Sequence, residues 1–288
     1  MPKQFIKPFW GAGEIVGGVP RYCIWVERDR LSLAKSSPEL SARFNEVERK
    51  RRETTRKATN VLADVPWRFG EVRQTDKDQL IVVPIHTSES RQILPMAILG
   101  SGEIVSNACY KLSNAPLWVF AILSSRCQIA WIATVCGKLE TRYRYSNTLG
   151  WNTFPVPKLT EQNKADLNHA AESILLARET HFPATLADLY DPEEMPDDLR
   201  RAHDENDEVL ERIYIGRRFR NDTERLEKLF DLYTKMTANA VPVKKSKKGK
   251  TAKSRCEVVD DDDTSASEIL DKCELCKKCM KEIKKHIK

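Results

Sequence analysis

The chain has 288 residues, of which 41% are hydrophobic and 31% charged, and its 11 glycines and 14 prolines exclude a collagen-like or low-complexity protein. The net charge of +6 is unevenly divided, because residues 1–158 hold 23 Lys and Arg against 14 Asp and Glu, whereas residues 159–243 hold 11 against 19. We therefore expect two modules, of which only the basic one faces a polyanion.

The N-terminal sequence lacks a charged and then apolar leader with a small-residue cleavage site, so we expect no secretion. The most apolar stretch, residues 115–136, carries Arg126 and Gln128 at its centre. We interpret it as a buried helix and expect no membrane partner. The eight cysteines then belong to a reducing, cytoplasmic setting without disulfides.

The first 158 residues mix predicted strands and helices, which indicates an α+β fold. Alternation in RYCIWVE predicts a strand over residues 21–27, and the glycines between Gly11 and Gly18 predict turns that lead into it. Ser37 and Pro38 open a helix that we expect to reach residue 63. Further strands are predicted over residues 68–73, 80–85, 93–98, 104–112 and 138–145, with the apolar helix over 115–136.

The residues after 158 have a helical pattern. We predict helices over residues 161–181 and 196–215, and a third over 226–236 that follows a capping box from Asn221 to Glu224. These helices make an all-α domain over residues 159–240. Residues 241–288 form a mostly disordered charged tail, with a short helix over about 266–286, because the first half of this tail has almost no apolar content.

The common motifs of cofactor binding and catalysis are missing from the sequence. It contains no Gly-rich dinucleotide or phosphate loop, no HExxH and no GxSxG. We therefore expect no catalytic residue and no cofactor on this chain.

Two charged stretches have a functional and a structural interpretation. Six basic residues between Arg49 and Lys57 fit phosphate contacts, but from the residues alone a solvated helix face paired with glutamates is favoured. The TSESR sequence at residues 87–91 offers hydroxyls, a carboxylate and a guanidinium that reach phosphates and base edges. An ordinary hairpin loop is the favoured alternative for it.

The most informative stretch is KLETRYRYS at residues 138–146. Its alternation predicts one strand that places Lys138, Glu140, Arg142 and Arg144 on one face. Lysine and arginine donate to guanine in the major groove, and glutamate accepts from cytosine. A charged edge strand that resists aggregation explains the same pattern, and the residues do not decide between the two.

A cluster of thiols stands in the tail. Cys273, Cys276 and Cys279, with His286, are ligand types that zinc accepts. Thiols three residues apart on a helix do not make a tetrahedral site, and a second CxxC is missing. We favour a tail without metal.

Several stretches together resemble one family. They are FIKPFWGAGEIVGGVPRYCIWV, SESRQILPMAI, SNACYKLSNAPLWVFAILSS, GKLETRYRYSNTLGWNTFPVP, ILLARETHFPATLADLYDPEEMPDDLRRAH and ERLEKLFDLYTKM. The chain resembles the C-terminal part of MmeI-type (type IIL) restriction-modification enzymes, which are DNA adenine methyltransferases fused to an endonuclease. The resemblance runs from Phe5 to about Met236.

The resemblance implies a DNA target recognition domain at residues 1–158, a helical C-terminal domain at 159–240, and double-stranded DNA as partner. The expected base-reading residues are Lys138, Glu140, Arg142, Arg144, Ser106 and Asn107. The expected DNA-backbone residues are Ser88, Glu89, Arg91, Arg52 and Arg56.

The family's catalytic and cofactor motifs are missing here, so we expect S-adenosylmethionine only on a separate or missing methyltransferase/endonuclease part that this chain directs to its site. The chain would then be a split subunit or a truncated remnant. The alternative is a protein-interaction remnant that docks on a methyltransferase subunit and does not read DNA.

Overall fold

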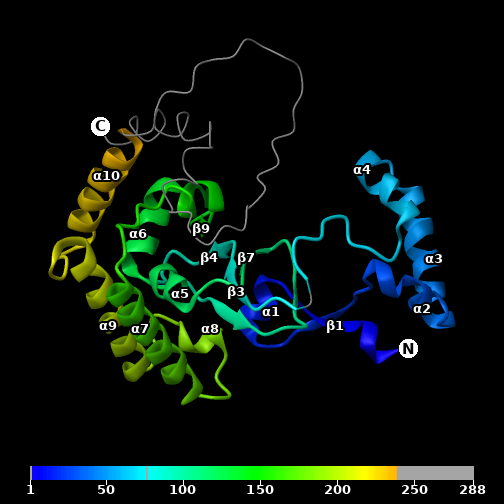
Figure 1. The fold of residues 1–288 in the computed structure, drawn as a ribbon, viewed down its shortest axis with the longest axis horizontal. Helices are drawn as coiled ribbons and strands as arrows, with labels where there is room; N and C mark the ends of the chain where they lie inside the picture. The colour runs from blue at the N-terminus through cyan, green and yellow to red at the C-terminus, as the bar shows by residue number, and fades with distance from the viewer. Residues whose placement is uncertain (1, 76, 239–288) are drawn as a thin grey trace, which may run out of the picture. The chain divides into compact units, whose positions relative to one another are not determined.

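The computed structural model describes residues 2–75 and 77–238 and combines helices with small sheets, which confirms the predicted α+β class (Figure 1). The predicted tail, with its cysteines, lies outside the described residues. The contacts separate two compact units. The first consists of Met1–Ile85, Pro95–Pro116 and Phe182–Glu194, and the second of His86–Leu94, Leu117–His181 and the described residues from Met195 onward. The expected domain boundary at residue 158 stays a prediction.

Two three-stranded sheets belong to the first unit. In one, β1 (Ile6–Trp10) lies between the antiparallel β2 (Arg21–Ile24) and the parallel β6 (Ile104–Val105). In the other, β3 (Leu80–Pro84) lies between β5 (Ala97–Leu99) and β7 (Cys109–Ser113), both antiparallel to it. Every residue of β3 is buried, which explains its continuous apolar sequence.

Three predictions for this unit are wrong. The glycine-rich residues form helix α1 (Ala12–Gly17), because the Glu14 carboxylate accepts from Gly11 N at 2.9 Å and Ile15 is buried in the core. Residues 68–73 form no strand, since the Arg68 carbonyl accepts from the Arg51 guanidinium at 2.8 Å. The predicted strand over 104–112 is divided between β6 and β7, which belong to different sheets.

The N-terminal helices of the first unit are α2 (Leu31–Lys35), α3 (Pro38–Glu53) and α4 (Lys57–Asn60), with short 3-10 turns at Lys3–Phe5, Arg28–Arg30 and Val61–Asp64. The predicted start of α3 is confirmed, since Ser37 Oγ accepts from Leu40 N at 3.5 Å. The predicted end at residue 63 is wrong. The helix stops at Glu53 because Asn60 Nδ2 donates to the Arg52 carbonyl at 2.9 Å and the chain folds back.

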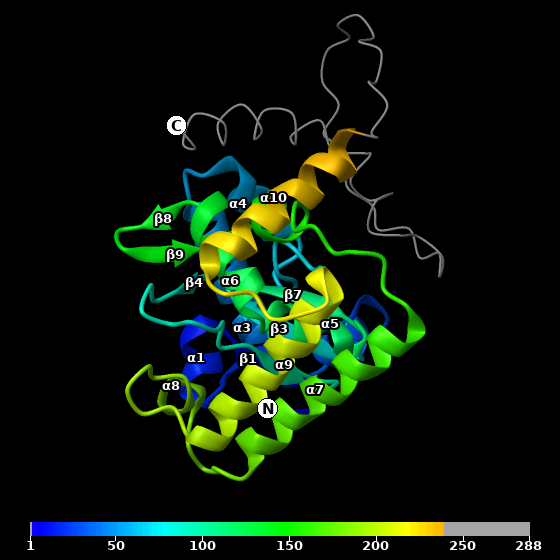
Figure 2. The same ribbon diagram turned by 90° about the vertical axis from the view of Figure 1, so that its left-hand side faces the viewer.

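The described residues of the second unit form one small sheet and five helices of seven or more residues. Its sheet contains β4 (His86–Thr87), β9 (Arg142–Arg144) and β8 (Lys138–Leu139), in that order. Its helices are α5 (Leu117–Leu123), α6 (Arg126–Val135), α7 (Glu161–Glu179), α9 (Asp197–Ile215) and α10 (Asp222–Ala238), and a π-helical turn spans Asn147–Trp151. α7 lies beside α9 in both ribbon views (Figures 1 and 2). The short α8 (Leu186–Leu189) belongs to the first unit and contacts α1.

The three helices predicted after residue 158 are confirmed as α7, α9 and α10. Their starts are specified locally. Thr160 Oγ1 accepts from Asn163 N at 3.1 Å, and Asn221 Oδ1 accepts from Glu224 N at 2.9 Å.

The long apolar helix predicted over residues 115–136 is two helices, α5 and α6, bent by 58°. Ser125 Oγ caps α6 by accepting from Gln128 N at 3.2 Å. Two buried side chains of α9 satisfy main-chain groups that the break exposes: Asn206 Nδ2 donates to the Ala121 carbonyl at 2.9 Å, and Asp207 Oδ1 accepts from Arg126 N at 2.8 Å. The helix therefore breaks where another helix supplies the missing hydrogen bonds.

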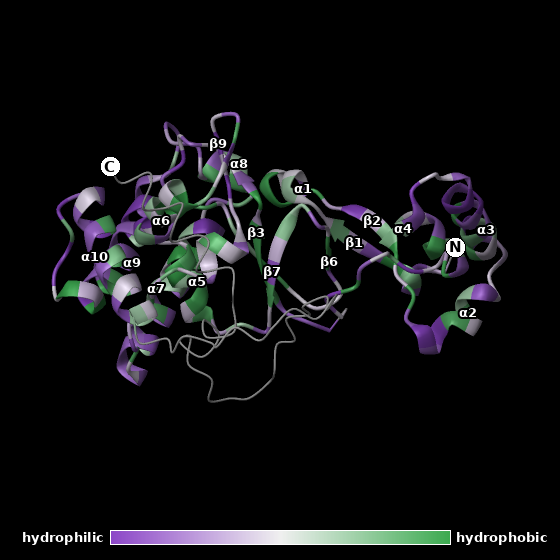
Figure 3. Cartoon of the chain, turned by 90° about the horizontal axis from the view of Figure 1, so that it is seen from above, coloured by the Kyte–Doolittle hydropathy of each residue, from purple (hydrophilic) through white to green (hydrophobic). Residues whose placement is uncertain are grey.

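The bent pair is rich in apolar residues (Figure 3). Among the described residues no single helix is long and apolar enough to cross a membrane, and α5 with α6 passes that test as a pair by length and composition alone. Most side chains of both helices are buried, and Trp131 of α6 packs against Phe230 of α10 with ring centroids 4.9 Å apart.

Candidate nucleic-acid interface

The charged stretch at residues 138–144 is a β-hairpin and not the single strand that its alternation predicts. β8 and β9 are antiparallel, with Lys138 opposite Tyr143 and Leu139 opposite Arg142. The turn contains Glu140, whose φ of 57° lies in the left-handed region. In Figure 2 the hairpin projects from the body of the second unit.

The register of the hairpin separates side chains that a single strand would place together. Opposite residues of paired strands share a face. Arg142, Arg144 and Leu139 therefore lie on one face, and Lys138 lies on the other, with its Nζ 5.4 Å from the ring centroid of Tyr143. The prediction of one face with four charges is wrong, because the turn reverses the chain in the middle of the pattern.

The serine-rich turn after β4 contacts the tip of this hairpin. The Glu89 carboxylate hydrogen-bonds to the Thr141 side chain, and this bond lowers the pKa of Glu89, with a further contribution from the charges of Lys138 and Arg142. Glu89 thus stays ionised at neutral pH. The structure brings together two groups that the sequence predicts separately, residues 88–91 and residues 138–144.

The turn itself is closed by its own hydrogen bonds. The Ser88 carbonyl accepts from Arg91 N at 3.3 Å, and the hydroxyls of Ser88 and Ser90 lie 2.9 Å apart. Glu89 is exposed at the surface, whereas Arg91 is half-buried. Of the three predicted backbone-contacting residues here, Ser88 is thus also a structural residue of the turn.

A buried glutamine supports the chain that follows the hairpin. Gln128 of α6 is fully buried, and its Nε2 donates to the Gly150 carbonyl at 2.9 Å and lies 3.5 Å from the Tyr145 hydroxyl. Gly150 is packed so closely that a Cβ there would lie 2.6 Å from the Tyr145 ring and 3.1 Å from Cys136 Sγ. These contacts position the segment that follows β9. In the sequence, Gln128 at the centre of an apolar stretch is the feature that could have indicated them.

The remaining predicted site residues lie in the first unit. Ser106 and Asn107 stand in the turn between β6 and β7, where Ser106 Oγ accepts from Ala108 N at 3.2 Å and Asn107 is exposed. Arg56 is exposed at the start of α4. Arg52 is bound by the carboxylates of Glu48 at 2.8 Å and Asp64 at 3.1 Å.

Most basic side chains of α3 have partners within the first unit. Ion pairs one turn apart join Arg49 to Glu53 at 2.6 Å, Lys50 to Glu46 at 3.2 Å and Arg52 to Glu48 at 2.8 Å. Arg51 donates to the carbonyls of Leu62 and Val65 at 2.8 and 2.9 Å. This helix face therefore has the glutamate pairing that the structural interpretation of its sequence requires.

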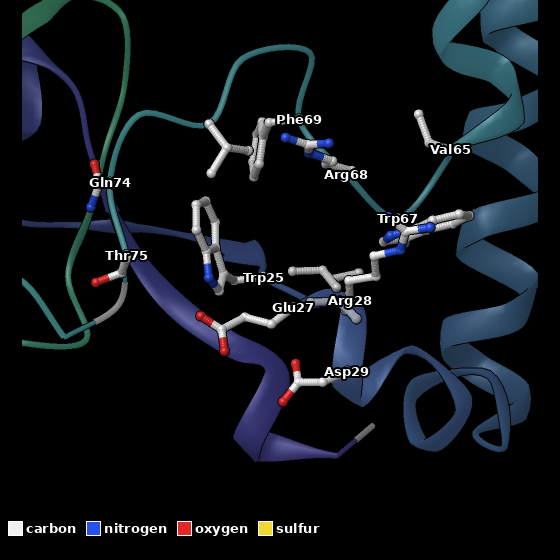
Figure 4. A pocket seen from close by; sticks show the side chains of 13 residues that line it. Trp25, Glu27, Arg28, Asp29, Val65, Trp67, Arg68, Phe69, Gln74 and Thr75 are labelled. Atoms are coloured by element: carbon white, nitrogen blue, oxygen red, sulfur yellow. The ribbon is translucent and has the colours of Figure 1, made fainter. Parts of the chain in front are cut away.

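A cavity of about 820 Å³ in the first unit was not anticipated from the sequence. Trp25 and Phe69 line it with ring centroids 6.0 Å apart, together with Trp67. The Trp25 Nε1 is buried without a hydrogen-bond partner, and Figure 4 shows the carboxylates of Glu27 and Asp29 on the same side of the cavity as this indole. Such a lining accepts an apolar or flat group that carries hydrogen-bonding atoms.

The described residues contain no group of three or more His, Cys, Asp or Glu side chains placed to hold a metal ion. Cys273, Cys276 and Cys279 lie outside the described residues, so the expectation of a tail without metal stays a prediction. The same holds for the expectation that S-adenosylmethionine binds elsewhere.

Small sheets combined with helices, and a charged hairpin at the surface, define an α+β module. Two family models match the chain: the MmeI target recognition domain over residues 1–158 and the MmeI C-terminal domain over residues 159–241. The chain belongs to the MmeI family.

Two relatives show the extent of the similarity. DNA methyltransferase A of Bacillus subtilis (strain 168) is 39% identical over 233 residues, which cover 81% of this chain and 26% of that protein. The solved structure of the type IIL restriction-modification enzyme MmeI in complex with DNA superposes with a TM-score of 0.77 at 33% identity, covering 82% of this chain and 31% of that one. The chain thus spans about a quarter to a third of the length of these relatives.

Proposed function

We propose that the chain is a sequence-specific DNA recognition module of a type IIL-like restriction-modification adenine methyltransferase and directs a catalytic part to its site. The observation that carries this proposal is the target recognition match over residues 1–158, within which the β8–β9 hairpin exposes Arg142 and Arg144 on one face. The major groove of B-DNA admits a two-stranded β-ribbon. The similarity to MmeI in complex with DNA supports the same partner.

In this proposal the hairpin and the β6–β7 turn read bases, and other polar side chains position the duplex. Arginine donates two hydrogen bonds to guanine, and a glutamate at the tip accepts from cytosine. The base-reading residues are Lys138, Glu140, Arg142, Arg144, Ser106 and Asn107. The backbone-contacting residues are Ser88, Glu89, Arg91, Arg52 and Arg56, and Arg52 exchanges its carboxylate partners for a phosphate.

A binding selection on randomised duplexes with the full chain tests base reading. We expect Arg142→Gln to move the preference from guanine to adenine at one position, because glutamine pairs with adenine. The discrimination per contact is about 1–3 kcal/mol. Lys164→Gln on α7 is the matched control and should select the wild-type sequence.

The outcomes separate the alternatives. If Arg142→Gln selects the wild-type sequence, Arg142 does not read a base. If the wild type binds DNA but selects no sequence, the proposal of sequence-specific recognition is wrong. A protein-interaction role without DNA reading is then supported. An exchange of Lys138 and Glu140 probes the two sides of the turn in the same assay, and should change the preferred base while leaving overall affinity near that of the wild type.

We propose further that this chain alone neither methylates nor cleaves DNA and that a methyltransferase/endonuclease part supplies both activities. The proposal rests on the missing catalytic and cofactor motifs in its sequence. Transfer of a labelled methyl group from S-adenosylmethionine to DNA, measured with the chain alone, checks it. Incorporation above the level of a no-protein control would refute it.

A further inference from the structure

Five arginines line a cavity beside the hairpin in the second unit. The cavity has a volume of about 580 Å³ and is bordered by residues 89–92, α6, Tyr143 of β9 and the turn between α9 and α10. The arginines face two carboxylates, those of Glu89 and Asp222. They are Arg91, Arg126, Arg218, Arg220 and Arg225.

Two of these arginines form ion pairs with carboxylates inside the protein. Arg225 is buried, and its guanidinium lies 2.6 Å from a carboxylate oxygen of Glu211 and 2.7 Å from one of Asp222. Arg126 lies 3.1 Å from Asp204 and 3.3 Å from Asp207. Their charges are compensated within the protein, so they hold helices together and leave little charge for a ligand.

The turn between α9 and α10 is held rigidly by carboxylates at its two ends. Glu211 Oε2 accepts from Phe219 N at 2.8 Å, and Glu224 Oε2 accepts from Arg220 N at 2.7 Å. Arg217 pairs with Glu224 at 2.5 Å and so compensates this acid. The backbone positions of residues 218–220 are therefore fixed before any ligand arrives.

The side chains of Arg218 and Arg220 extend from this turn, and carboxylates compensate little of their charge. Both residues are exposed, and the Arg220 side chain is 80% exposed with its Nε 3.7 Å from the shared Glu224 carboxylate. In the part of the chain that the structure describes, Arg218 forms no ion pair. The two guanidiniums border the same cavity as Tyr143 of the hairpin strand β9, and their charge is available for an anionic group beside the hairpin.

We propose that Arg218 and Arg220 bind a backbone phosphate of the DNA that the β8–β9 hairpin reads. The inference rests on the proposed function and extends it to the C-terminal domain, whose net acidic sequence predicts no contact with a polyanion. Arginine donates two parallel hydrogen bonds to a phosphate, and such contacts carry affinity and register without sequence information. The C-terminal domain thereby contributes to positioning the hairpin on the duplex.

The experiment measures binding of the full chain to a pool of randomised duplexes by fluorescence anisotropy at several salt concentrations. The concentrations run from about 0.05 to 0.2 M, where the loss of phosphate contacts changes the affinity strongly. We expect Arg218→Ala/Arg220→Ala to bind every sequence more weakly. Loss of this phosphate contact lowers the affinity about fivefold to tenfold near 0.1 M salt and flattens the plot of log K against log salt by about 0.9. The selected sequence stays that of the wild type.

The matched control is Arg201→Ala, an exposed arginine of α9 that does not line the cavity. It should keep the wild-type affinity and salt slope. Three outcomes overturn the inference while DNA binding by the wild type stands. The double variant keeps the wild-type affinity and salt slope, the control loses as much affinity as the double variant, or the double variant changes its sequence preference. Absence of DNA binding by the wild type overturns the proposed function and this inference together. A thermal melt of each variant, expected to match the wild type, excludes a folding defect as the cause of weaker binding.

Discussion

Substitution of Glu211 by alanine tests whether the buried ion pair holds the α9–α10 turn. Glu211 is fully buried and accepts from Arg225 Nε at 2.7 Å and from Phe219 N at 2.8 Å. Removal of one partner of a buried pair costs about 3–5 kcal/mol, because the other charge stays buried without compensation. Asp222 remains 2.7 Å from Arg225, so we expect the low end, a loss of about 3 kcal/mol in the free energy of unfolding.

Urea unfolding followed by tryptophan fluorescence measures this loss. Glu208→Ala is the matched control on the same helix, since Glu208 pairs at 2.5 Å with Arg212, whose side chain is 65% exposed. An exposed pair of this kind contributes about 0.5 kcal/mol or less. If Glu211→Ala loses less than about 1 kcal/mol, or no more than the control, the ion pair does not anchor the turn and the reasoning from burial is wrong.

Two further substitutions follow from buried contacts in the second unit. Burial raises the pKa of Asp207 to about 7 despite the hydrogen bond from Arg126 N, so this group stabilises the fold fully below about pH 4, and the contribution is lost as the pH rises to about 7. Asp207→Asn should remove this decline, and a variant much less stable than wild type at pH 8 would show that the ionised pair is net stabilising. Gly150→Ala forces a methyl group against the Tyr145 ring and should lower the free energy of unfolding by about 1–3 kcal/mol in urea titrations. Gly137→Ala should be neutral, because nothing lies within 4 Å of the Cβ that it adds, and equal effects of the two substitutions would contradict the packing argument.

The hairpin shows why part of the candidate site could not be predicted. A period of two along residues 138–145 fits a strand, and the residues of that stretch do become β8 and β9. The turn falls on Glu140, a residue with no strong preference for the left-handed backbone that it adopts. The pairing of β9 with β4, about 57 residues earlier in the chain, contributes to the register, and this contact has no local signal.

Local interactions determined the helices that the sequence predicts correctly. The starts of α3, α7 and α10 follow from Ser37, Thr160 and Asn221, whose side chains accept hydrogen bonds from backbone N–H groups three residues later. Such bonds involve four consecutive residues, so the amino-acid sequence specifies them directly.

The tertiary structure decided where the apolar helix breaks, which charged side chains share a face and which arginines remain available. Asn206 and Asp207 end the helix from a distance of about 80 residues in sequence, and Glu211 neutralises Arg225 while Arg218 and Arg220 stay exposed. The net charge of a segment does not show which arginines are exposed, because a buried ion pair removes both its charges from the surface. A domain with a net negative charge can therefore still present a basic turn. The sequence by itself determined the family, the fold class and the local helix starts, whereas pairing between distant side chains determined the geometry of the candidate interface.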